Sequence, residues 1–399
     1  MRFRVFIIGM IGLLMLAVSL FTFISWLGKK IEKSSKKYLL VLMMLVGLVG
    51  AGLFGVMSKN YLTLRKNGGV DVEQTTNQVS ESNAKERLML PTAYSTVEAT
   101  HPSVHVFDKA WNGYKYWMAV TPYPKGDAAK ENPHVFVSND LITWLEPKEG
   151  MNPLDEVKSE KMDKDAPLQY NSDTHLVYNE EENRIEVYWR YVDDVNDQVT
   201  IYRRNSSDGQ NFEPKEIVYQ APRKKADWVS PAFVKDKDGY KVWYVANGYR
   251  MWYRESKDGL NWSEEQEIKM PYAVHADKMY HWHIDVQKIE GQYEALVSGF
   301  EKQGTEFQTS DRHVMSLYYS TSKDGKEWKA LKEVLAPSHV ADAWDGKGLY
   351  RSCFVKDKDE YLVFYSGIGF DNTRGIGISH GPNMQSLEGI DYSHLTVGN

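Results

Sequence analysis

The sequence predicts an all-β five-bladed β-propeller preceded by a transmembrane α-helical hairpin. Three observations carry this prediction: two uncharged apolar runs near the N-terminus, a short motif that recurs five times in the remaining chain, and alternating apolar and polar residues between the copies. We expect two transmembrane helices joined by a basic loop within residues 1–57, a polar linker at 58–92 and the propeller at 93–399.

The two apolar runs predict the membrane hairpin. Residues 5–28 and 38–57 contain no charged side chain and are 24 and 20 residues long. A helix rises about 1.5 Å per residue, so each run is long enough to cross a hydrocarbon core of about 30 Å. A cleavable signal peptide is the alternative for the first run, but that run is longer than a usual signal core and a second run follows at once.

The charges around these runs predict the orientation. The loop between the runs carries five lysines, and two arginines precede the first run. Because positive loops stay in the cytoplasm, we expect a cell-membrane protein whose propeller is extracytoplasmic.

Small residues recur in the second run at four-residue spacing, at Gly47, Ala51 and Gly55. Such a stripe favours close helix packing, so a homodimer through this run is one interpretation.

Charge and cysteine content exclude several classes of protein. Residues 1–57 hold seven Lys or Arg and one Glu, a net charge of +6, while the other 41 basic and 53 acidic residues give −12. An acidic body is a poor nucleic-acid binder, because phosphate neutralisation needs a cationic face. The single cysteine, Cys353, excludes an intramolecular disulfide and an all-cysteine zinc site.

The repeated motif predicts the propeller. The pattern S-x-D-G-x-x-W begins at Ser256 and Ser322. The copy at Ser206 has Phe in place of Trp, the copy at Ser138 keeps only Ser, Asp and Trp, and a more degenerate copy begins at Ser379. In chain order the five copies start 68, 50, 66 and 57 residues apart. Asp-Gly favours hairpin turns, and strand-like runs precede the turns at 228–234, 240–246, 283–289 and 293–298. Four short strands in about 60 residues are typical of a propeller blade, whereas an immunoglobulin-like sandwich needs about 100 residues per unit.

The blade topology indicates which residues form a site. The first strand of each blade lines the central channel, so the strand starts and the second-to-third loops share one face. The Asp-Gly turns fall on the opposite face, where we expect their Asp and Ser side chains to bond local backbone groups. The site face then holds ten candidate residues: Asp173, Asp285, Glu131, His101, Arg190, Trp228, Trp282, His283, Trp344 and Arg351.

These residue types favour carbohydrate chemistry. Cleavage of a glycosidic bond uses one carboxylic acid and one carboxylate, and we predict these roles for Asp173, Asp285 and Glu131. The other candidates are predicted to bind substrate, because flat indole rings suit sugar faces and arginine binds anionic groups.

No metal and no cofactor are predicted. His281, His283 and Asp285 share one face of a predicted strand, which is an arrangement that could hold a metal ion. At about 3.3 Å per residue, however, His281 and Asp285 would lie roughly 13 Å apart, which is too far to share one ion without a bend.

The body resembles the five-bladed glycosidases of the arabinanase and β-xylosidase type, and more distantly the levansucrase and invertase group. The resemblance rests on the hairpin motifs, on His101-Pro102-Ser103 and Ser172-Asp173, and on Val229-Ser230-Pro231. In that family the first blade contributes an Asp base, the second an Asp that tunes the acid, and the third a Glu acid. Asp173 matches the second residue, whereas His101 replaces the first and the third stretch has no carboxylate.

Two functional hypotheses follow. The first is a membrane-anchored glycoside hydrolase-like propeller acting on a cell-surface or exported polysaccharide, with acids such as Asp285 and Glu131 replacing the missing ones. The second is a non-catalytic glycan-binding or scaffolding module of an envelope polysaccharide system. Sialidases also use Asp-containing hairpins, but theirs have one more residue between Asp and Trp, and an obvious arginine trio is lacking here.

Overall fold

The structure is a computed structural model that describes residues 82–158, 168–225, 227–246, 248–302 and 309–391. Across these stretches, no helix has the length and apolar character that a membrane crossing requires. The two predicted membrane helices, the stripe of Gly47, Ala51 and Gly55, and linker residues 58–81 lie outside the described residues.

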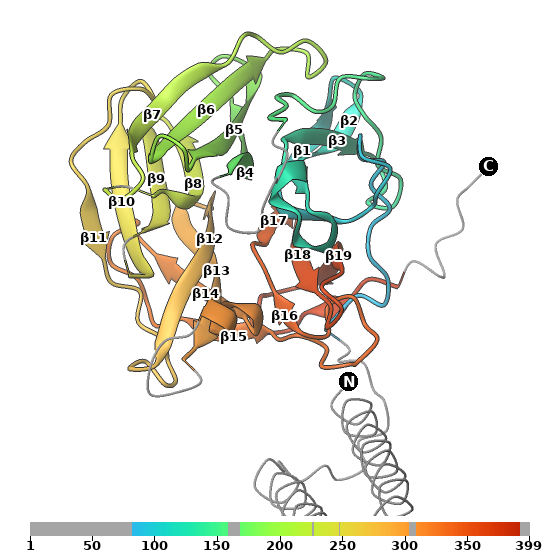
Figure 1. Cartoon of the computed structure of the whole chain (residues 1–399), viewed down its shortest axis with the longest axis vertical. Coiled ribbons are helices and arrows are strands. Elements are labelled where there is room, and N and C mark those ends of the chain that lie inside the picture. The colour runs from blue at the N-terminus through green and yellow to red at the C-terminus, as the bar shows by residue number, and fades with distance from the viewer. Residues whose placement is uncertain (1–81, 159–167, 226, 247, 303–308, 392–399) are drawn as a thin grey trace, which may run out of the picture. The chain divides into compact units, whose positions relative to one another are not determined.

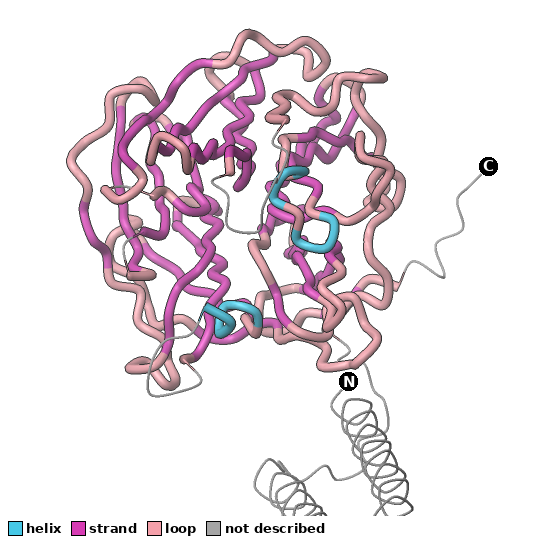
Figure 2. Tube along the Cα trace, viewed as in Figure 1, coloured by secondary structure: helices cyan, strands magenta, loops and turns pink. Residues whose placement is uncertain are grey.

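Five antiparallel sheets follow one another along the chain and are arranged around a common axis (Figure 1). The predicted five-bladed propeller is therefore confirmed. Strands make up most of the described fold, and its short 3₁₀ helices lie in loops between strands (Figure 2); they are η1 (Pro124–Gly126), η2 (Ala128–Lys130) and η3 (Thr309–His313).

We number the blades 1 to 5 in chain order. Blade 1 contains β1 (Ala99–Trp111), β2 (Tyr114–Pro122) and β3 (His134–Ser138). Blade 2 contains β4 (Gln169–Asn179), β5 (Arg184–Asp193), β6 (Gln198–Ser206) and β7 (Glu216–Pro222). Blade 3 contains β8 (Val229–Asp236), β9 (Gly239–Ala246), β10 (Arg250–Ser256) and β11 (Gln266–Ile268).

Blades 4 and 5 complete the ring. Blade 4 contains β12 (Met279–Ile289), β13 (Gln292–Glu301), β14 (Ser316–Ser322) and β15 (Lys332–Leu335). Blade 5 contains β16 (Gly348–Leu349), β17 (Cys353–Asp357), β18 (Glu360–Ile368), β19 (Arg374–Gly381) and β20 (Glu388–Gly389). The first strands of neighbouring blades contact one another, and β17 of blade 5 contacts β1 of blade 1.

The innermost strand of every blade is irregular at one level. Pairing with the second strand shifts between Thr100 and Ser103 in β1, and the corresponding shifts in the other blades fall at 172–175, 229–232, 281–283 and 349–353. His101, Asp173 and Ser230 lie inside three of these shifts with φ of 55°, 51° and 51°. Left-handed backbone at non-glycine residues is costly and often marks functional sites. The irregularities therefore direct attention to this level of the channel.

The repeated hairpin turns lie where the sequence predicts them, between the third and fourth strands of blades 2, 3 and 4. Asp208 Oδ1 accepts hydrogen bonds from the backbone N–H groups of Gln210 and Asn211, both at 2.8 Å. Ser206 Oγ accepts one from Gly209 N at 2.8 Å. The same bonds recur at Asp258 and Asp324, so the predicted local role of these side chains is confirmed.

The hydrophobic core is divided among the interfaces between neighbouring blades. One buried cluster, which includes Trp243 and Val286, joins blades 3 and 4. Comparable clusters join blades 1 and 2, 2 and 3, 4 and 5, and 5 and 1. Burying apolar area between the blades is the main stabilising contribution to this ring.

The N-terminal end of the described chain packs into the ring. Leu88 and Leu90 are buried in the cluster between blades 5 and 1, and Leu88 N donates to Ile376 O at 2.7 Å. Ala84 is buried between blades 4 and 5. The structure therefore includes in the folded unit residues that the sequence analysis placed at the end of a linker.

Candidate active site

A polar pocket opens at the level of the strand irregularities. Its volume is about 280 Å³. All five blades contribute to it, through their innermost strands, through the second strand of blade 2 and the third strand of blade 5, and through the loops beside them: His101, Tyr123, Ala128, Glu131, Tyr170, Ser172, Asp173, Arg190, Arg223, Asp227, Val229, Trp282, His283, Arg312, His313, Tyr350 and Arg374. The strand starts that the topology predicts to converge do form one cavity.

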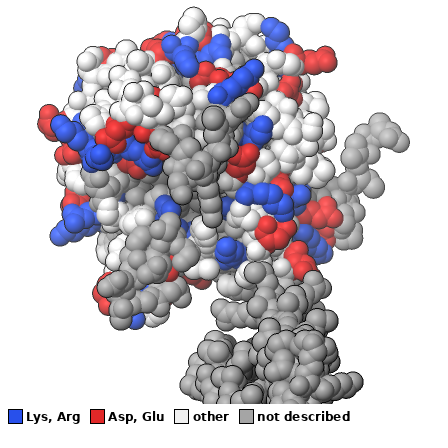
Figure 3. Space-filling model, in the orientation of Figure 1, with Lys and Arg blue, Asp and Glu red and all other residues white. Residues whose placement is uncertain are grey.

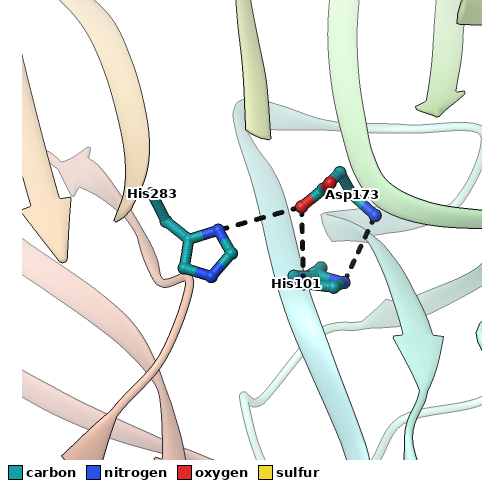
Figure 4. A group of neighbouring side chains, drawn as sticks. All are labelled: His101, Asp173 and His283. Carbon is teal, nitrogen blue, oxygen red and sulfur yellow. Dashed lines mark hydrogen bonds and ion pairs between the residues drawn. The ribbon is translucent and has the colours of Figure 1, made fainter. Parts of the chain in front are cut away.

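Two histidines and one aspartate meet at the base of this pocket (Figure 4). His101 Nε2 lies 3.4 Å from Asp173 Oδ1, and His283 Nδ1 lies 3.8 Å from the same oxygen. One possible ligand atom from each residue lies within 4.8 Å of the other two, and all three side chains are buried. Imidazole nitrogen and carboxylate oxygen are ligands for zinc and related transition metals.

Hydrogen bonds from neighbouring blades hold these three residues in place. Ser230 Oγ of blade 3 donates to Asp173 Oδ1 at 3.0 Å and also bonds His283 Nδ1. His101 Nδ1 lies 2.9 Å from Thr121 Oγ1 and accepts a bond from Asp173 N at 3.3 Å. The group is therefore fixed by partners from several blades.

The electrostatics of the group suit a cation. Burial lowers the pKa of His101 to about 3, against the opposing effect of Asp173, and lowers the pKa of His283 well below its usual value. Burial alone would raise the pKa of Asp173, but nearby positive charges, which include the arginines Arg190 and Arg351, lower it. Neutral imidazoles beside an ionised carboxylate are the protonation states that a metal ion requires.

Unsatisfied polar atoms provide a second test of whether an ion fits. Nε2 of His101 and Nε2 of His283 are buried without a hydrogen-bond partner. Buried polar groups are normally paired, so orphaned imidazole nitrogens in one group indicate a missing ligand. His101, Asp173 and His283 therefore fit a divalent cation.

Glu131 lies beside this group at the end of η2. Its Oε2 is 3.5 Å from His101 Nδ1 and is buried without a hydrogen-bond partner. Burial, and then the charge of Asp173, raise the pKa of Glu131 well above its usual value. A carboxyl group with a raised pKa can hold or release a proton near neutral pH, as a general acid or base must.

Arginines line the side walls of the pocket. Arg190 contacts the Asp227 carboxylate, and its Nε donates to Asp227 O at 2.8 Å. Arg223 contacts Asp194 and lies 3.5 Å from Asp227 Oδ1. These two guanidinium groups are therefore largely neutralised by acidic partners.

Six of the ten predicted site residues line this pocket. They are Asp173, Glu131, His101, Arg190, Trp282 and His283. Trp282 presents its ring to the Arg312 guanidinium at 4.3 Å.

Asp285 and Arg351 were predicted to act in the site but lie deeper in the channel. Both are fully buried, and neither lines the pocket. Asp285 Oδ1 is 3.8 Å from His175 Nδ1, and burial raises the pKa of Asp285 to about 6. The physical reason is spacing: Asp285 lies two residues beyond His283, which along a strand moves it about 6 to 7 Å down the channel.

Two predicted sugar-stacking tryptophans pack against the apolar clusters between neighbouring blades instead. Trp228 is fully buried between the rings of Tyr219 and Tyr244, at centroid distances of 4.2 and 4.5 Å. Trp344 stacks on Tyr365 at 5.3 Å. Neither lines the pocket, so the ring-stacking role does not transfer to them.

Sequence reasoning missed several residues of the pocket. Tyr123, Tyr350 and Arg374 line it together, with the Arg374 guanidinium 5.2 Å from one ring and 5.6 Å from the other. Tyr350 directly precedes the predicted Arg351 and was within reach of the strand-start argument. Arg374 begins a third strand and carried no comparable signal.

Comparisons with known proteins agree with the fold. No family model matches the chain. The chain is 27% identical over 308 residues to an A type blood N-acetyl-alpha-D-galactosamine deacetylase from Flavonifractor plautii; the match covers 66% of this chain and 38% of that enzyme. The chain thus spans well under half the length of this curated relative.

Solved structures share the architecture. An N-acetylgalactosamine deacetylase from F. plautii, solved with blood group B trisaccharide, has a TM-score of 0.64 and 22% identity over 75% of this chain and 95% of that one. A GH43 β-xylosidase/α-arabinofuranosidase from a compost microbial metagenome has a TM-score of 0.50 and 16% identity over 77% and 98%. The chain is therefore similar to five-bladed propeller enzymes that act on glycans, in agreement with the resemblance to arabinanases and xylosidases.

Proposed function

We propose that this chain is a metal-dependent hydrolase that removes the N-acetyl group from an amino sugar of a glycan. The observation that carries the proposal is the buried group of His101, Asp173 and His283. Within this group, His101 stands where arabinanase-type glycosidases are expected to have a carboxylate. The deacetylase activity of the F. plautii relative supports the same reaction.

The residues of the pocket divide the work as follows. His101, Asp173 and His283 would hold the ion, which when bound supplies Lewis-acid activation of a water molecule and of a carbonyl group. Glu131 accepts the proton of the attacking water and returns it to the nitrogen that leaves. The products are acetate and a free amine, so atoms balance with water as the co-reactant.

A second candidate is cleavage of a glycosidic bond by the two carboxylates. Asp173 and Glu131 line the same pocket, and burial of Glu131 raises its pKa as a general acid requires. This reaction needs no ion. The third possibility, glycan binding without cleavage, uses the same pocket without bond breaking.

One assay separates the three functions. The full-length chain in a mild detergent is incubated with N-acetylated oligosaccharides while acetate and new reducing ends are both measured. Our proposal predicts acetate without reducing ends, loss of activity with EDTA, recovery with a divalent cation, and loss in His283→Ala but not in His275→Ala, an exposed histidine of the same blade region. Reducing ends that survive EDTA would favour the glycosidase, and no product with retained binding would favour the binding module.

The location is also a proposal. We infer that residues 1–57 anchor the protein in a membrane and that the propeller works outside the cell on a surface or exported polysaccharide. The lysine-rich loop at 29–37 supports this orientation. A cysteine introduced into that loop should resist membrane-impermeant maleimides in intact cells, whereas one introduced at the exposed Ser207 should react; the reverse pattern would overturn the orientation.

A further inference from the structure

We propose that the pocket binds an anionic group of its glycan substrate through Arg374. This inference rests on the proposed function, because it names the class of glycan that the same site accepts. The group is an oxyanion with at least two oxygens, either the carboxylate of an acidic sugar or a phosphate ester.

Two guanidinium nitrogens of Arg374 have no hydrogen-bond partner among the described residues. The residue is 5% exposed and lines the pocket. Its Nη2 donates to Asn372 Oδ1 at 3.0 Å, but Nε and Nη1 are buried without a partner. A buried donor left unpaired costs about 1–3 kcal/mol, and more when it is charged. A substrate oxyanion would remove that cost.

The surroundings hold this guanidinium in one place. The rings of Tyr123 and Tyr350 flank it. The backbone N–H of Arg374 donates to Glu98 Oε2 at 2.9 Å. The nearby loops are also ordered, since Lys125 forms an ion pair with Asp371 at 2.7 Å. A side chain fixed in this way loses little entropy when it binds a ligand.

Arg374 differs from the other arginines whose ion pairs the structure records in the pocket. Arg190 and Arg223 share Asp227, and Arg223 also contacts Asp194. Among the described residues, no carboxylate forms an ion pair with the Arg374 guanidinium. On the face in Figure 3, acidic and basic side chains are intermixed.

The geometry of arginine explains the choice of ligand. A guanidinium presents parallel N–H donors that match two oxygens of a carboxylate or phosphate. Nη1 and Nη2 form such a pair at the end of the guanidinium; Nη1 is unpartnered, and Nη2 has two N–H bonds and donates to Asn372 Oδ1. A neutral hydroxyl could accept one of these bonds but could not balance the charge.

The test compares acidic probes with neutral ones. Binding of glucuronic acid, its methyl ester, glucose 6-phosphate and glucose to the full-length chain is measured by ligand-observed NMR in the presence of EDTA, so that no metal ion attracts the anion. We expect at least one acid to bind about tenfold or more tightly than its neutral counterpart, since a charge-assisted bond carries about that difference. The acid that does so identifies the carboxylate or the phosphate as the ligand.

Variants of Arg374 test whether the preference for acidic over neutral probes depends on this residue. Arg374→Gln should bring the ratio of acid to neutral binding close to one, Arg374→Lys should keep part of it, and Arg250→Gln, which alters an exposed arginine on the outer side of blade 3, should leave it unchanged. Equal binding of acids and neutral probes by the wild-type chain, or an unchanged ratio in Arg374→Gln, would overturn the inference. The wild-type comparison decides the matter even if a variant fails to fold.

The outcome is separable from that of the proposed function. Acetate release together with equal binding of acids and neutral probes would overturn this inference and leave the hydrolase proposal standing. A clear acid preference without acetate release would do the reverse.

Discussion

Replacing Arg351 by methionine should destabilise the propeller and loosen the base of the site. The guanidinium is fully buried in the channel. It donates to the backbone oxygen of Thr174 in blade 2, lies 3.2 Å from His175 Nδ1, and reaches Pro231 O of blade 3 at 3.4 Å. One side chain from blade 5 therefore links the innermost strands of two other blades.

The size of the effect follows from what the substitution leaves behind. Burial raises the pKa of Asp285 and the charge of Arg351 opposes this effect; Asp285 Oδ1 already lacks a hydrogen-bond partner. Removing one partner of a buried charge pair costs about 3–5 kcal/mol, because the other charge stays desolvated. We expect that loss for Arg351→Met, and a smaller loss when Asp285→Asn is added, since the stranded charge is then removed.

Urea unfolding of the full-length chain, followed by tryptophan fluorescence, measures these changes. The matched control is Arg250→Met, which removes a solvent-exposed arginine paired with Glu267 and should change the free energy of unfolding by less than about 1 kcal/mol. A loss below about 1 kcal/mol for Arg351→Met, or additive losses in the double variant, would refute this reasoning.

Three further predictions concern a turn, an ion-paired aspartate and the acid of the pocket. Gly209→Ala should cost about 1–3 kcal/mol of unfolding free energy, because its Cβ would lie 2.0 Å from Trp117 Cη2, and Gly113→Ala, which has open space at a similar φ, should cost less; equal losses would exclude the clash. Lys288 and its neighbours lower the pKa of Asp236 below its usual 3.8, so the ionised Asp236 stabilises the fold above about pH 4 and this contribution is lost on acidification. In Asp236→Asn the free energy of unfolding should therefore depend less on pH below about 4. The same pH dependence in the variant and the wild-type chain would contradict this prediction. Glu131→Gln should lower acetate release about 10²- to 10⁴-fold while metal binding persists; loss of the ion would make Glu131 a ligand instead.

The fold could be predicted because its signals are local. Each Asp-Gly turn is specified within seven residues, and the strands beside it alternate with a period of two. The same reasoning placed His101, Asp173 and His283 near one axis, since propeller topology fixes where innermost strands begin.

The group of His101, Asp173 and His283 could not be predicted from spacing along one strand. On a regular strand His281 and Asp285 are too far apart to share an ion, and we therefore predicted no metal; the register shift between His281 and His283 breaks the regular geometry there. His281 Nδ1 lies 3.0 Å from the Tyr272 hydroxyl. The three residues that do meet come from three blades, and their approach depends on left-handed backbone at His101 and Asp173 that ordinary sequence patterns do not signal.

Titration of the metal-free, full-length chain with Co²⁺ tests the central claim most directly, because cobalt bound by imidazole and carboxylate has a visible d–d spectrum. We expect one ion per chain, with the spectrum lost in His101→Ala, Asp173→Asn and His283→Ala and kept in His275→Ala. No cobalt spectrum in the wild-type chain, or the same spectrum in all three site variants, would contradict it.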